Sequence, residues 1–163
     1  MEKIHWRFCV GACFLALLGR GFASALDKDA PPVRTGLAAF LKGELPGDKV
    51  IITYTDLHGL HGGLRLTIHG TGKVEQEAVR IEAGEPHDVT REDFEALVRL
   101  LIEREAWQQK VPERSPVPDE SRASLTIVVG EEKSTIWEWY NDMKANDRLI
   151  RIREKMTAIA WQK

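Results

Sequence analysis

The sequence predicts an α+β domain: an antiparallel sheet of about five strands, in the order β-β-β-α-β-β-α, with two helices packed on one face. Three observations predict this fold. Residues 64–69 alternate apolar and polar side chains, as a half-buried strand does. Residues 90–105 repeat apolar side chains at helical spacing behind a capping signal. Short β-branched segments are joined by glycine-containing turns, so neighbouring strands are expected to form hairpins.

Residues 1–25 are expected to be a signal peptide. Lys3 and Arg7 precede a 12-residue apolar run at 8–19, and the sequence ASA at 23–25 supplies a cleavage pattern. The run is too short to cross a bilayer, which needs about 20 residues. Residues 10–13 resemble a lipoprotein cleavage box, with lipidation at Cys13 as the alternative to cleavage after Ala25. We expect soluble export to the periplasm or the medium, with no integral membrane segment after signal removal.

The remaining chain is mildly acidic and free of cysteine, because both cysteines lie in the signal segment. The net charge is −2 for the whole chain, and removal of one acid and three bases with the signal leaves −4. Such a protein is a poor general ligand for nucleic acid, so no nucleic-acid partner is expected. We assign residues 26–48 to an extended leader, with a short helical turn possible at 35–42, and residues 49–163 to one α+β domain.

The first three strands are expected at 50–55, 64–69 and 73–81. Their expected core side chains are Val50, Ile52, Tyr54, Leu64, Leu66 and Ile68. Alternation slips within the third strand, as a β-bulge would cause. The loop at 56–63 contains Gly59, Gly62 and Gly63, which match neither a dinucleotide fingerprint nor a P-loop and are explained by turn chemistry.

The second half of the chain repeats the pattern of a helix and a hairpin. Thr90 is the expected N-cap of a helix that runs to about Glu105. Strands follow at 124–129 and 133–140, and the closing helix carries an apolar stripe at Leu149, Ile152, Met156 and Ile159. Arg148, Arg151 and Lys155 on that helix are expected to form a solvated basic face. Trp137 and Trp139 are either core residues, which we favour, or an exposed patch for a partner.

Residues 50–161 resemble a family of small exported bacterial proteins of unknown function. The resemblance rests on a glycine-rich turn followed by the strand LRLTIHGTGKVE, and on the capped helix VTREDFEALVRLLIEREAW. A looser similarity, in element order and in the pair Gly62-Gly63, is to emfourin-type protein inhibitors of thermolysin-like metalloproteases. This sequence departs from both where His69 and Gly70 replace the usual Asp-Gly turn. Neither resemblance supplies a catalytic residue.

Three of the five histidines lie in or beside the first hairpin and form the sharpest candidate site. Imidazole is a common ligand of Zn²⁺ and other transition metals, so His58, His61 and His69, with Asp56 as an oxygen ligand, could bind a metal. The alternative is a solvated loop in which the histidines serve turn chemistry, with no cofactor.

The expected function is binding and not catalysis, because no G-x-S-x-G motif or cysteine nucleophile follows the signal segment. We expect an exported binding or inhibitor-like module with another protein as its partner. Its expected binding residues are His58, His61, Arg65, Thr67 and His69. A transition-metal-binding protein and a structural envelope component are the alternatives.

Overall fold

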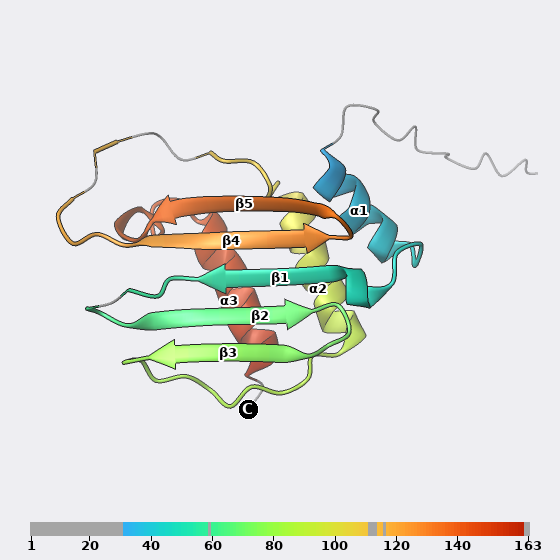
Figure 1. Ribbon diagram of the computed structural model, residues 1–163, viewed down its shortest axis with the longest axis horizontal. Coiled ribbons are helices and arrows are strands. Elements are labelled where there is room, and N and C mark those ends of the chain that lie inside the picture. The colour runs from blue at the N-terminus through green and yellow to red at the C-terminus, as the bar shows by residue number, and fades with distance from the viewer. Residues whose placement is uncertain (1–30, 59, 111–113, 116, 162–163) are drawn as a thin grey trace, which may run out of the picture.

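The structure is a computed structural model, and it describes residues 31–58, 60–110, 114–115 and 117–161. Over these residues the chain forms one five-stranded antiparallel sheet with three α-helices (Figure 1). The predicted α+β class and antiparallel sheet are therefore confirmed. The expected signal peptide and its alternative cleavage box lie outside the described residues.

The sheet has the strand order β3-β2-β1-β4-β5. The strands are β1 (Val50–Thr55), β2 (Gly63–His69), β3 (Val74–Val79), β4 (Arg122–Val129) and β5 (Glu132–Trp139). The central strand β1 pairs with both hairpins, β2–β3 on one side and β4–β5 on the other. β2 and β3 pair residue for residue, so the bulge expected in the third strand is absent.

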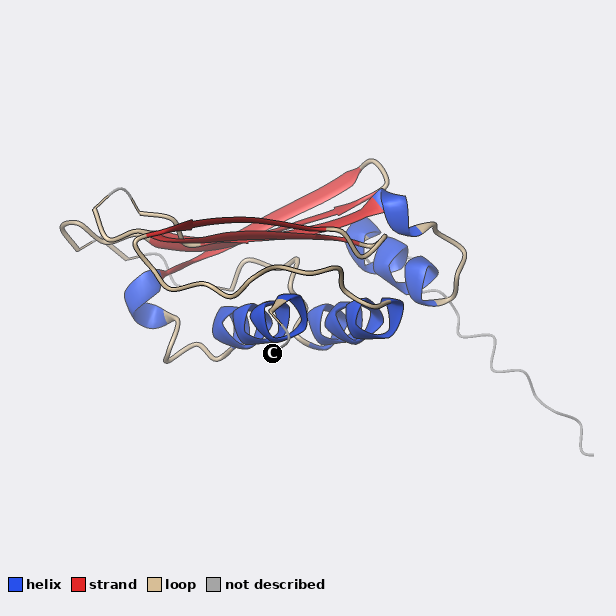
Figure 2. Cartoon of the chain, turned by 90° about the horizontal axis from the view of Figure 1, so that it is seen from below, coloured by secondary structure: helices blue, strands red, loops and turns tan. Residues whose placement is uncertain are grey.

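The described helices cover one face of the sheet, and we call the other face, which none of them covers, the bare face (Figure 2). The helices are α1 (Pro32–Leu41), α2 (Arg91–Glu103) and α3 (Arg148–Ala160). α1 lies where an extended leader with at most a helical turn was expected. Its buried residues Val33, Leu37 and Phe40 recur at helical spacing, and the Phe40 ring meets Phe94 edge-on at 5.3 Å. The folded core therefore begins before residue 49.

The predicted alternation accounts for the core. Every inward residue predicted for β1 and β2 is fully buried: Val50, Ile52, Tyr54, Leu64, Leu66 and Ile68. The predicted cap of α2 is also present, since the Thr90 hydroxyl accepts a hydrogen bond from the Asp93 backbone N–H at 3.1 Å. The buried side chains of β1 and β2 join those of α2 and α3 in one hydrophobic core.

The two tryptophans of β5 lie on the bare face of the sheet and not in the helix-covered core. Trp139 is nonetheless buried, at 4% exposed, and Trp137 is half-buried. The Arg122 guanidinium covers both rings, at 4.1 Å from the centroid of Trp137 and 4.6 Å from that of Trp139. Cation–π contacts therefore bury these rings where the helix layer does not reach.

A side chain occupies the outer edge of β5 at Trp137. The Gln109 side-chain amide donates to the Trp137 carbonyl oxygen at 2.8 Å and accepts from the Trp137 backbone N–H at 3.0 Å. These are the two bonds that a further strand would make there. Gln109 thus satisfies backbone groups that an edge strand leaves unpaired.

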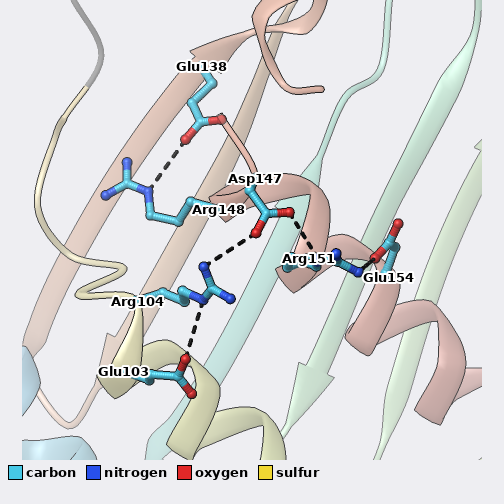
Figure 3. A network of polar contacts seen from close by, with 7 residues as sticks. All are labelled: Glu103, Arg104, Glu138, Asp147, Arg148, Arg151 and Glu154. Atoms are coloured by element: carbon cyan, nitrogen blue, oxygen red, sulfur yellow. Dashed lines mark hydrogen bonds and ion pairs between the residues drawn. The ribbon is translucent and has the colours of Figure 1, made fainter. Parts of the chain in front are cut away.

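A buried ion pair joins β5 to α3 (Figure 3). Arg148 Nε lies 3.4 Å from Glu138 Oε1, and the two side chains are 8% and 0% exposed. Arg148 also donates to the Gln108 carbonyl oxygen at 2.7 Å. Burial raises the pKa of Glu138 above its ordinary value, against the attraction of Arg148. The solvated basic face expected on the last helix is therefore wrong for Arg148, although Arg151 is exposed.

Candidate functional site

The end of the sheet opposite α1 contains a cleft of about 400 Å³. In Figure 1 this is the left end, where the β1–β2 loop and the segment before β4 project beyond the strands. The cleft is lined by these two segments, by the turn after β5 and by α3. Its polar lining residues include Asp56, His58, His61, Glu120, Asn141 and Arg153.

Asp56 directly follows β1 and lies at the base of the cleft, with 3% of its surface exposed. Its Oδ1 accepts a hydrogen bond from the Leu64 backbone N–H at 2.6 Å, and its Oδ2 accepts one from the Tyr54 hydroxyl at 2.9 Å. Arg153 Nε lies 3.3 Å from the same Oδ2. Two hydrogen bonds and one counter-charge therefore offset the cost of burying this carboxylate.

The pair Gly62-Gly63 permits this arrangement. Gly63 has a φ of +139°, and a Cβ there would lie 2.5 Å from the Asp56 carbonyl oxygen and 2.8 Å from its Oδ1. Gly62 has a φ of +78°, and its Cβ would lie 2.0 Å from the Val79 carbonyl oxygen. Close approach of the backbone, in addition to turn conformation, therefore requires glycine at both positions.

The Tyr54 hydroxyl is a fixed donor beneath the cleft. Burial raises the pKa of Tyr54 far above its ordinary value of 10.0, and the neighbouring Asp56 carboxylate raises it further. The hydroxyl therefore stays protonated at physiological pH and donates a hydrogen bond to Asp56. This hydroxyl also lies 3.7 Å from the Met143 sulfur, which places it among side chains of the core.

An arginine fixes the wall formed by the segment before β4. Arg114 donates two hydrogen bonds to the Glu120 carboxylate, at 2.9 and 2.7 Å, and its Nε donates to Asp142 at 3.0 Å. These bonds lower the pKa of Glu120 and raise that of Arg114. The guanidinium also lies 5.2 Å from the Trp139 ring centroid. Glu120 is thus committed to Arg114, and the wall is tied to the turn after β5.

The structure brings together two of the three histidines proposed as metal ligands. The His58 and His61 rings stack with centroids 4.9 Å apart and planes 13° apart. A metal ion lies in the plane of each imidazole that binds it, and two nearly parallel stacked rings share no such point. His58 Nδ1 already accepts hydrogen bonds from the Leu60 and His61 backbone N–H groups, at 3.3 Å each.

His69 lies at the other end of β2, so it does not complete the proposed site. A strand rises about 3.3 Å per residue, which puts the ends of this seven-residue strand roughly 20 Å apart. His69 instead approaches Glu75, with 3.5 Å between Nε2 and Oε1. Over the described part of the chain, no group of three His, Cys, Asp or Glu side chains is placed to hold a metal ion.

The other two expected binding residues, Arg65 and Thr67, lie on the bare face of the sheet and not in the cleft. Arg65 pairs with Glu77 at 2.7 Å on the neighbouring strand. The Thr67 hydroxyl is 3.0 Å from that of Thr53. Both are engaged in cross-strand pairs, which stabilise the sheet.

Arg153 is the cleft residue that the sequence interpretation missed. It follows Leu149 by four positions and precedes Met156 by three, so it lies on the same side of α3 as the apolar stripe. The same spacing places Arg148 four residues before Ile152. An arginine at a core-facing position of a helix could therefore have indicated a buried polar site, because such a charge needs a buried partner.

Comparisons with protein-family models, with curated proteins and with solved structures found no match to this chain. Among the helices within residues 31–161 that are described, none has the length and apolar character to cross a membrane.

Proposed function

We propose that the protein is an exported, non-enzymatic binding module that contacts another protein through the cleft end of its sheet. The supporting observation is the distribution of exposed apolar side chains. Among the described residues, four large hydrophobic side chains are between 39% and 62% exposed, and all four belong to segments at this end of the sheet. They are Leu60, Val79, Val117 and Tyr140.

These four residues come from separate parts of the chain. Leu60 is in the β1–β2 loop, Val79 ends β3 opposite Gly63, Val117 precedes the lining residue Pro118, and Tyr140 lines the cleft. Exposed apolar side chains concentrated at one end of a molecule are typical of surfaces that bind other proteins, and tyrosine is frequent at such surfaces. We call these four residues the apolar rim.

The polar groups beneath the rim favour binding over catalysis. The Tyr54 hydroxyl is committed to Asp56, and the Glu120 carboxylate to Arg114. A general acid or base must exchange its proton near neutral pH, whereas the Tyr54 pKa is raised and the Glu120 pKa lowered, both away from neutrality. Groups held in fixed hydrogen bonds are suited to presenting a preorganised surface.

Affinity capture from the envelope fraction and culture medium tests this function. The wild type is compared with Leu60→Ser/Tyr140→Ser on the rim. The matched control is Glu131→Ser/Lys133→Ser, two exposed positions at the opposite end of the sheet. We expect one protein to be retained by the wild type and by the control, and to be at least tenfold depleted with the rim variant. Equal retention by all three, or no reproducible partner for the wild type, would sink the proposal.

Inhibition of a secreted metalloprotease is one concrete form of this function, and it rests on the resemblance to emfourin-type inhibitors. Adding the protein to thermolysin in a peptide-cleavage assay tests it. Dose-dependent inhibition that is lost in the rim variant is the expected result for an inhibitor, and unaltered cleavage excludes thermolysin as a target.

A further inference from the structure

We infer that the cleft receives the carboxyl terminus of a peptide chain, with the terminal carboxylate at Arg153 and the last apolar side chain in an adjoining pocket. The inference rests on the proposed function and names the part of the partner that binds. It is carried by the position of Arg153 at the junction of two cavities.

The second cavity is small, about 60 Å³, and lies beside the cleft. Its lining combines the apolar side chains of Met143 and Ile150 with the cations Lys144 and Arg153, and it shares Tyr140 and Arg153 with the cleft. A pocket with apolar walls and cations at its margin matches an apolar side chain that carries a negative charge next to it.

Arg153 pairs with Asp56 through one side of its guanidinium. Asp56 Oδ2 lies 3.3 Å from the Nε atom, which is buried and has no hydrogen-bond partner among the described residues, and the guanidinium carbon lies 6.0 Å from the Tyr54 ring centroid. The side chain is 33% exposed. An arginine that is held from one side by a buried carboxylate can present its terminal nitrogens to a ligand, and their fork geometry matches a carboxylate.

The Asp56 carboxylate repels a second carboxylate, and the hydrogen bonds that its two oxygens accept fix its orientation without removing its charge. Glu120 is likewise bonded to Arg114. Lys144 is exposed and has no acidic partner within 4 Å among the described residues, so it adds attraction at the margin of the small pocket. Asp119, in the segment before β4, has no partner among the described residues. Its charge disfavours acidic residues at the peptide positions that precede the terminal one.

A carboxyl terminus is the occupant that satisfies both cavities at once. An internal peptide segment offers an apolar side chain but only neutral backbone groups beside it. A terminal residue places its carboxylate one bond from the carbon that bears its side chain, so the two groups reach neighbouring sites together. Capture of terminal carboxylates is a recurring mode of peptide recognition.

Fluorescence anisotropy with N-terminally labelled peptides tests the inference. The probes are five-residue Gly-Ser-Gly-Ser-X peptides in which X is alanine, valine or leucine, each with a free carboxylate and each with a carboxamide. We expect the wild type to bind the valine and leucine acids at least tenfold more tightly than the matching amides. Arg153→Gln should abolish this preference, and Lys144→Gln should reduce it about threefold.

Arg151→Gln is the matched control on the same helix, because Arg151 is exposed and lines neither cavity. It should keep the full preference for the acids. If Arg153→Gln fails to fold, as thermal unfolding would show, the exposed Lys144 variant still tests the role of charge. Equal affinity of acids and amides for the wild type overturns the inference. If rim-dependent capture of a partner succeeds while no acid binds preferentially, the inference fails and the proposed function stands.

Discussion

The buried pair of Glu138 and Arg148 predicts an asymmetric response to mutation. At 3.4 Å the Coulomb attraction is about 5 kcal/mol at an effective dielectric constant of about 20. Desolvation costs several kcal/mol for each ion, so the intact pair is close to neutral in its contribution to stability. The raised pKa of Glu138 indicates that, for the carboxylate, desolvation outweighs the attraction.

Arg148→Met should therefore cost about 3–5 kcal/mol of unfolding free energy at pH 7, because it leaves a fully buried carboxylate without its cation. Glu138→Gln should cost less, about 1–2 kcal/mol, because the glutamine amide oxygen can still accept a hydrogen bond from Arg148 Nε, and Arg148 keeps its hydrogen bond to the Gln108 carbonyl oxygen. The double variant Glu138→Leu/Arg148→Met should lie within about 2 kcal/mol of the wild type, since neither charge remains buried.

The cost of Arg148→Met should also depend on pH. The folded-state pKa of Glu138 lies above its ordinary value of 4.5, so protonation favours the folded state. Stability linked to protonation of Glu138 is present below pH 4.5 and is lost as the pH rises through the folded-state pKa. The cost of Arg148→Met should therefore be smaller at pH 5 than at pH 7. Guanidinium chloride unfolding at pH 5 and pH 7 measures the effect. A loss that is the same at both pH values, or a Glu138→Gln loss as large as that of Arg148→Met, would refute the reasoning.

Three further predictions concern the cleft and the sheet. Gly63→Ala should lower the unfolding free energy by at least about 2 kcal/mol in urea unfolding, because its Cβ meets Asp56. The control Gly43→Ala, also at positive φ but with open space around it, should lower it by about 1 kcal/mol. Tyr54→Phe should cost about 1–3 kcal/mol in the same assay, since a buried Asp56 oxygen loses its hydroxyl donor. Gln109→Ala should cost about 1–2 kcal/mol and speed hydrogen exchange at the Trp137 amide; unchanged exchange there would contradict the role of Gln109 at the β5 edge.

The elements that the sequence predicts well are those in which local pattern and tertiary environment agree. Alternation in β2 and the threonine cap of α2 depend on near neighbours, and both are found as predicted. α1 was missed because its leader begins with charges and prolines, although Val33, Leu37 and Phe40 are spaced as a helix would need.

The candidate site was predicted only in part, because it is built by segments distant in the chain. The importance of the 56–63 loop is visible in the sequence, but Arg153 reaches it from a helix almost 100 residues later. The three histidines do not form one metal site because His69 lies at the opposite end of β2 from His58 and His61, although the three are close in sequence. The sequence favoured the core for Trp137 and Trp139, but both lie on the bare face, where arginine stacking buries side chains that the helix layer does not reach.

Occupation of the β5 edge by Gln109 limits how this protein can assemble. Open-ended growth through strand pairing requires two free sheet edges on every molecule, one to accept a neighbour and one to recruit the next. Gln109 occupies the outward backbone groups of β5 at Trp137, so a neighbouring strand could pair continuously along β5 only after Gln109 is displaced. This disfavours fibre growth through the β5 edge.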